Sequence, residues 1–144
     1  LEEDNSPPES IDIMIDFLKK LPDLDHIAFQ YKHNINLILS KFLLLKGEDQ
    51  SLEEAKQILT DLITHHENEK QYRALGAEKV ILGELQLLQS ETDEGIEIIK
   101  NGLDLLNNHK QVQIIALYEV KKISDILPPE PKQEITKLLA NYSD

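Results

Sequence analysis

The chain contains no cysteine, which excludes disulfide frameworks, zinc–cysteine sites and thiol catalysis. Arginine occurs once, at Arg73, and 15 basic residues stand against 27 acidic ones, for a net charge of −12. A nucleic-acid-binding face needs clustered lysine and arginine, so we expect no direct binding of nucleic acid by this segment. No apolar run approaches the roughly 18 residues that a membrane-spanning helix needs, and the first residues do not have the pattern of a signal peptide. We therefore expect a cytoplasmic protein without a membrane partner.

The chain also has little that favours β-structure. Valine occurs three times, aromatic residues make up 5%, and there are five glycines among 144 residues. β-Sheets favour β-branched and aromatic residues and need glycine in their tight turns. Leucine and isoleucine dominate the 40% of hydrophobic residues, which is enough for the core of one domain. The composition therefore predicts an all-α fold.

Apolar residues at helical spacing predict about seven helices. The first begins after Pro8 and ends before Pro22, and the second ends at Gly47, which fits a C-cap. Ser51, with Glu54 three residues later, is the predicted N-cap of the third helix. The predicted helices cover residues 9–21, 25–46, from 51 until the pattern fades at 65–68, 69–89, 92–106, 111–127 and 132–142.

Two of the predicted helix pairs share an internal pattern. Residues 38–46 and 81–89 both read Ile, Leu, small, charged, apolar, any, Leu, Leu, polar, at an offset of 43. The helices that follow them match at an offset of 40, with Glu54-Ala55 against Glu94-Gly95. A single helix pair cannot bury its apolar face alone, so the pattern predicts that successive pairs stack.

This pattern suggests how the chain is organised. We interpret residues 1–8 as a flexible leader and residues 9–144 as one helical repeat domain, and we expect the chain to be part of a longer protein. Residues 9–21 look like the second helix of a unit whose first helix lies upstream. The alternative is a helix that caps the array.

Glycine lies inside predicted helices, where it costs about 1 kcal/mol relative to alanine. Gly83 is central in its helix, and Gly95 and Gly102 lie seven residues apart in the next one. Such glycines are easiest to explain where a second backbone packs very close. The sequence therefore predicts a close helix–helix contact at these positions.

These positions resemble the tetratricopeptide repeat. Leu82-Gly83, Gly95, Ile99 and Gly102-Leu103 meet the family's pattern of small and bulky residues in a helix pair. The preceding unit meets it with Leu39-Ser40, Ala55 and Leu59, and departs from it at Leu62. The resemblance covers residues 37–106, with repeats longer than the usual 34 residues and without the family's usual aromatic residue and inter-repeat proline. It implies a right-handed stack of antiparallel helix pairs.

No residues form a recognisable catalytic motif. A zinc site needs three or four converging ligands, commonly with two histidines at i and i+4 of one helix. His26 and His33 are seven apart, and His65 and His66 are adjacent near a predicted helix end, where the macrodipole favours them. We interpret all four as solvated or helix-end histidines and expect no catalytic activity, no metal and no cofactor. A metal-dependent enzyme built on these histidines is the least supported of three hypotheses.

The resemblance also implies a concave groove that binds extended peptides or partner helices. Its walls come from the second, fourth and sixth helices. A clamp for acidic peptide tails is not expected, because Glu84 stands where a basic partner is needed, and a basic or apolar ligand fits the net charge better. For Leu37 and Val80 the alternative is that they only pack the array. The residues expected to face the groove are Asn34, Leu37, Lys41, Ala77, Val80, Glu84, Gln113 and Leu117.

The function expected from these observations is a non-catalytic module that binds a protein or peptide as scaffold or adaptor. The alternative is the peptide-sensing and dimerisation domain of a bacterial transcription regulator, to which the acid-rich, Lys-, Ile- and Asn-heavy repeats are similar. A homodimer is a further expectation, because a helical array has open apolar ends.

Overall fold

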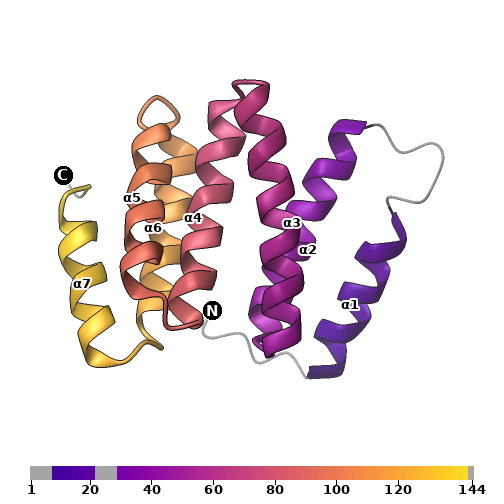
Figure 1. The fold of residues 1–144 in the computed structure, drawn as a ribbon, viewed down its shortest axis with the longest axis horizontal. Helices are drawn as coiled ribbons and strands as arrows, with labels where there is room; N and C mark the ends of the chain where they lie inside the picture. Colours follow the sequence, from indigo (N-terminus) through magenta and orange to yellow (C-terminus); the bar gives the residue numbers. More distant parts are fainter. Residues whose placement is uncertain (1–7, 22–28, 143–144) are drawn as a thin grey trace. The chain divides into compact units, whose positions relative to one another are not determined.

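The computed structural model describes residues 8–21 and 29–142, and these form seven helices and no strand (Figure 1). The prediction of an all-α fold with about seven helices is confirmed. Residues 1–7 of the predicted leader, and the predicted start of the second helix at residue 25, lie outside the described residues. The helices are α1 (Pro8–Lys20), α2 (Phe29–Lys46), α3 (Asp49–Asn68), α4 (Tyr72–Leu88), α5 (Thr92–Leu105), α6 (Lys110–Ser124) and α7 (Pro129–Ala140).

Three helix starts among the described residues differ from the prediction by two residues or more. Helix α4 begins at Tyr72 and not at Glu69, because residues 69–71 form the turn after α3. Helix α7 begins at Pro129 and not at Lys132, because proline is tolerated in a first turn, where its missing N–H would have no partner. Helix α3 begins at Asp49, and Ser51 is therefore not its N-cap. The Ser51 hydroxyl instead accepts a hydrogen bond from the Glu48 backbone N–H at 3.0 Å and donates one to the Glu48 carbonyl at 2.8 Å. Ser51 thus lies inside the first turn of α3, and its side chain provides hydrogen-bond partners for the backbone of Glu48, which precedes the helix.

The chain contacts group into two compact units, residues 1–58 and residues 59–144. The first contains α1, α2 and the first half of α3, with α1 packed on α2. Lys46 binds Asp12 of α1 at 2.7 Å, and Lys19 of α1 binds Glu54 of α3 at 2.8 Å. The buried apolar side chains of this unit are Ile15, Leu18, Leu39, Leu43, Leu52 and Ala55.

The second unit contains the end of α3 and helices α4 to α7. One apolar core joins α4, α5, α6 and α7. Its buried members are Val80, Leu87, Ile99, Leu103, Leu106, Ala116, Val120, Ile135 and Leu138.

Helices α4 and α5 touch backbone to backbone at two pairs of glycines. A Cβ atom on Gly102 would lie 2.6 Å from the carbonyl oxygen of Gly76, and one on Gly83 would lie 2.7 Å from that of Gly95. In each helix the two glycines are seven residues apart, so both lie on one face. The predicted close contact at Gly83, Gly95 and Gly102 is confirmed, and Gly76 is its fourth member.

Two turns of the second unit end helices in the same way. After α3 the Gln71 N–H binds the His66 carbonyl at 2.9 Å, and after α4 the Glu91 N–H binds the Gln86 carbonyl at 2.8 Å. These bonds define Schellman caps, whose C′ residue takes a left-handed conformation that glycine adopts most easily. The C′ residues here are Lys70, with φ of 57°, and Ser90, with φ of 66°.

Glycine at either C′ position is expected to stabilise the protein. A side chain in the left-handed region is strained by about 1 kcal/mol, and the Ser90→Gly and Lys70→Gly variants should each gain about 0.5–1 kcal/mol in free energy of unfolding. Urea denaturation measures this gain. Gln89→Gly is the matched control, since Gln89 has a φ of −91° and should gain nothing. Ser90→Gly and Lys70→Gly variants no more stable than the wild type would contradict the prediction.

No helix in the described part of the chain is long and apolar enough to cross a membrane.

Candidate functional site

The structure places the predicted groove residues in both units. Asn34, Leu37 and Lys41 lie on α2 in the first unit, where Asn34 and Lys41 are exposed and Leu37 is half-buried. The other five lie on α4 and α6 in the second unit, and of these Ala77 and Leu117 are half-buried. A groove lined by all three helices stays a prediction.

Three of the predicted groove residues are buried. Val80 belongs to the apolar core, as the packing alternative expects, and Glu84 is buried on the same helix. The side-chain amide of Gln113 donates hydrogen bonds to the Leu103 carbonyl at 2.9 Å and to Asn107 Oδ1 at 3.1 Å. Gln113 thus ties the start of α6 to the end of α5, which is a structural role. These three side chains offer little surface to a ligand.

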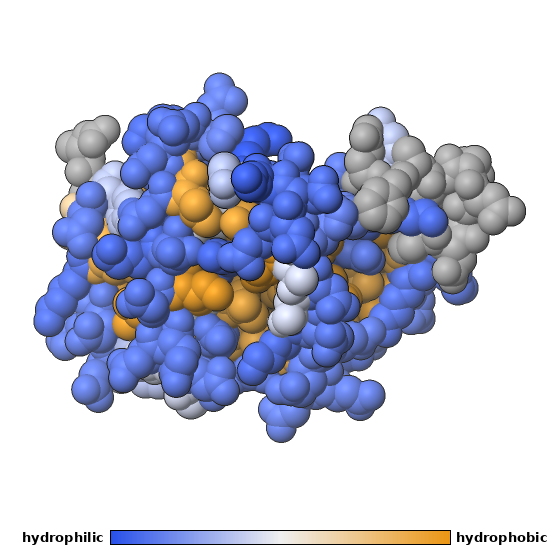
Figure 2. Space-filling view, turned by 45° about the horizontal axis from the view of Figure 1, so that its top comes forward, coloured by the Kyte–Doolittle hydropathy of each residue, from blue (hydrophilic) through white to orange (hydrophobic). Residues whose placement is uncertain are grey.

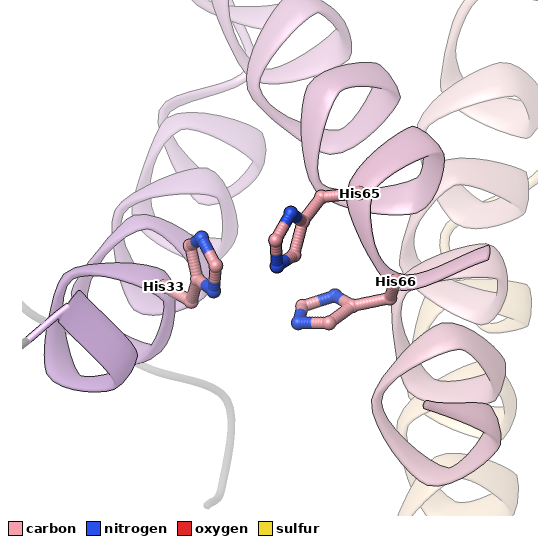
Figure 3. Close-up of side chains that lie close together, drawn as sticks. All are labelled: His33, His65 and His66. Carbon is pink, nitrogen blue, oxygen red and sulfur yellow. The ribbon is translucent and has the colours of Figure 1, made fainter. Parts of the chain in front are cut away.

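His65 and His66 are adjacent near the end of α3 (Figure 3), with their ring centroids 5.1 Å apart and their planes at 73°. His66 is only 8% exposed and therefore not solvated, but it lies in the last turn of α3, which fits the alternative of a helix-end histidine. Its Nδ1 lies 2.7 Å from Oε2 of Glu78 on α4, and Glu78 is 2% exposed. The three-residue turn after α3 places these two side chains opposite each other.

The buried Glu78 carboxyl is electrostatically costly. Burial raises its pKa above the ordinary value, and the hydrogen bond and positive charge that His66 offers act in the opposite direction. Its second oxygen, Oε1, is buried without a hydrogen-bond partner among the described residues. The contact between His66 and Glu78 therefore joins the end of α3 to α4.

An open pocket of about 520 Å³ lies between α6 and α7. Ile114 lies one turn before this pocket on the same face of α6 and is 62% exposed, and Tyr118 is 60% exposed. Single exposed hydrophobic residues are ordinary, but a contiguous group around a pocket indicates a binding surface. We refer to Ile114 and the pocket residues together as the α6–α7 surface. The pocket residues are Leu117, Tyr118, Lys121, Thr136, Leu139, Ala140 and Tyr142.

Tyr142 fixes one end of this surface. Its hydroxyl donates a hydrogen bond to Asp104 Oδ1 on α5 at 2.6 Å. Burial, together with the neighbouring Asp104 carboxylate, raises the pKa of the Tyr142 phenol above its ordinary value, so the hydroxyl stays protonated. The end of α7 is thereby held on α5, and the aromatic ring remains in the pocket wall.

Lysines gather at the other end of the α6–α7 surface. Lys121 lies 3.2 Å and Lys132 lies 3.9 Å from the same carboxylate, Asp125. The ammonium of Lys122 lies 5.8 Å from the centre of the Tyr118 ring, in cation–π geometry. Three lysines thus lie at this end of the surface, and two of them share the Asp125 carboxylate.

Sequence reasoning found only Leu117 of this surface. Tyr118, Leu139 and Tyr142 were missed, because no sequence pattern marks them as exposed. Figure 2 shows hydrophobic side chains reaching the molecular surface in patches that hydrophilic side chains border. Which apolar residues are exposed depends on how the helices pack, and the sequence pattern does not give this.

No protein-family model, curated protein or solved structure matches this chain. Function is therefore inferred from the surfaces and charges of the chain itself.

Proposed function

We propose that the chain is a non-catalytic interaction module that binds a segment of another protein on the α6–α7 surface, as a scaffold or adaptor. The single observation that carries this is the contiguous apolar surface around an open pocket, with Ile114 and Tyr118 both more than half exposed. The glycine contacts between α4 and α5 support the tetratricopeptide-like helix pairing that the sequence resembles, and repeats of that kind typically serve binding.

The local charge indicates the chemistry of the ligand. Residues 107–142 carry five lysines and four acidic residues, although the whole chain carries 15 basic and 27 acidic residues. The net charge alone predicted a basic or apolar ligand. The lysines beside the α6–α7 surface instead favour an apolar segment with acidic side chains at one end.

The ligand class can be tested by selection. Random peptides displayed on phage are selected on the immobilised 144-residue chain, and we expect enrichment of peptides that combine apolar residues at helical spacing with acidic residues. The affinity for the selected peptides, measured by fluorescence anisotropy, should fall by about tenfold or more in the Ile114→Ser/Tyr118→Ser variant. This variant lacks two apolar side chains that the bound peptide would bury.

Tyr72→Ser is the matched control, since Tyr72 is an exposed tyrosine of α4 in the same unit and outside the α6–α7 surface. It should leave peptide binding unchanged. Equal loss in both variants, or no enrichment of any peptide by the wild type, would refute the proposed function.

A further inference from the structure

Helix α1 has two apolar faces, and only one of them is covered. Ile15 and Leu18 are buried on the face that packs against α2. Ile13 and Phe17, one helical turn apart, are 67% and 55% exposed on a different face, and Met14 is exposed beside them. We refer to Ile13, Met14 and Phe17 as the α1 stripe. An exposed stripe of this kind is typical of a helix that docks on a second surface.

The charge of this segment is one-sided. Residues 1–16 contain six acidic residues and no basic one, and the first lysines follow at Lys19 and Lys20. Glu9, Asp12 and Asp16 belong to α1 itself. The α1 stripe therefore lies on a helix whose N-terminal part contains acidic residues and no basic one.

The α6–α7 surface has the complementary properties. Ile114, Tyr118 and Leu139 provide apolar contacts. At one end, Lys121 and Lys132 share the carboxylate of Asp125, and Lys122 lies beside the Tyr118 ring. An acidic helix with an apolar stripe is the ligand that such a surface favours, since the apolar contacts supply affinity and the opposite charges orient the helix.

We propose that α1 of one copy of this chain docks on the α6–α7 surface of a second copy. The proposal depends on the same surface as the proposed function, and it names the ligand. The two contacting faces differ, so the association is heterologous and each bound copy leaves one free stripe and one free surface. Assembly is then head-to-tail and does not stop at a dimer unless the copies close into a ring.

A symmetric dimer through two α6–α7 surfaces is the main alternative. It brings Lys121 and Lys122 of both copies into one interface, where like charges oppose association. It also leaves the apolar α1 stripe exposed. The complementary charge of residues 1–16 favours the head-to-tail arrangement over this one.

Sedimentation velocity of the full 144-residue chain tests the proposal. One helix in a groove is smaller than a standard interface of about 1,600 Å², so we expect micromolar affinity and a measurement range of about 1–500 μM. The wild type should grow beyond a dimer as its concentration rises. Ile13→Ser/Phe17→Ser and Ile114→Ser/Tyr118→Ser should each associate about tenfold or more weakly. All four side chains are exposed, so both variants should keep the wild-type circular dichroism and melting temperature.

The decisive sample is the mixture of the two variants. The first variant keeps an intact α6–α7 surface and the second keeps an intact α1 stripe, so together they should form a one-to-one heterodimer that grows no further. Ile126→Ser, at an exposed residue outside the α6–α7 surface, is the control and should assemble like the wild type.

Three results would overturn the proposal: a wild type that stays monomeric, a mixture that stays monomeric while the wild type assembles, or either double variant assembling as the wild type does. A symmetric dimer gives the last result, because only the α6–α7 variant then loses association. Peptide binding by a monomeric chain would remove this inference and keep the proposed function. Assembly without any peptide enrichment would keep the inference and remove binding of other proteins.

Discussion

We expect the Gly102→Ala variant to lose about 2 kcal/mol of its free energy of unfolding, although alanine is the better helix former. A Cβ atom at this position would lie 2.6 Å from the carbonyl oxygen of Gly76 and 3.0 Å from the backbone nitrogen of Val80. Both neighbours are backbone atoms of α4, so no side chain can rotate away. The clash is relieved only if α4 and α5 move apart.

The size of the effect follows from two opposing terms. Replacing glycine inside a helix by alanine gains about 1 kcal/mol in helix propensity. Overpacking a rigid contact costs about 3 kcal/mol at the upper end of its usual range, and separation of α4 from α5 disturbs the core around Ile99 and Leu103. The cost therefore exceeds the gain.

Urea denaturation followed by circular dichroism measures the difference. Glu97→Ala is the matched control, since Glu97 is an exposed residue of the same helix and its removal should change stability by no more than about 0.5 kcal/mol. A Gly102→Ala variant as stable as the wild type would show that the two helices do not need this close contact.

The second large effect is expected from His66→Leu, which removes the partner of the buried Glu78 carboxyl. Breaking a buried ion pair from one side costs about 3–5 kcal/mol when the remaining charge must stay. Glu78 escapes part of this cost by binding a proton, which costs about 1.4 kcal/mol for each pH unit above its ordinary pKa of 4.5. We therefore expect a loss of about 3 kcal/mol at pH 7, at the lower end of that range.

This loss should depend on pH in a fixed direction. Burial makes the pKa of Glu78 higher in the folded chain than in the unfolded chain, and the loss of His66 removes the contribution that opposes this shift. The folded state then binds the proton more tightly than the unfolded state does. Its stabilisation is complete below pH 4.5 and is lost as the pH rises through the raised pKa. At pH 5 we expect His66→Leu to lose less than about 1 kcal/mol.

Unfolding free energies measured at pH 5 and pH 7 test this expectation. The double variant His66→Leu/Glu78→Leu is the control, because it removes both polar groups and should recover most of the stability at pH 7 without the pH dependence. A loss in His66→Leu that is equal at both pH values would assign its cause to packing and not to the Glu78 charge.

The sequence predicted the helices well because their signals are local. Apolar residues recur at helical spacing in all seven, and Gly47 ends α2 with a φ of 74°, as its C-cap assignment requires. Gly83, Gly95 and Gly102 were recognised as a close contact because glycine inside a helix is costly unless space demands it. Each of these inferences needs only neighbouring residues or the cost of one residue.

Some helix starts and turns were predicted wrongly or missed. The residues at these positions are compatible with more than one local structure. Pro129 and Pro131 follow the predicted sixth helix, and proline can either end a helix or begin one, so only the observed start of α7 at Pro129 decides between the two. Lys70 and Ser90 adopt left-handed backbone conformations, which lysine and serine residues do not predict. The Schellman caps around them became visible only through their backbone hydrogen bonds.

Composition and periodicity by themselves determined the fold class, the number of helices and the glycine contact, because these follow from local backbone preference and from the cost of single residues. Only the tertiary structure decided that His66 is buried against Glu78, that Val80, Glu84 and Gln113 are covered, and which apolar residues of α1 and α6 stay exposed. These outcomes depend on the rotation and register of one packed helix against another. Helical periodicity fixes which residues share a face, and packing fixes which face is covered.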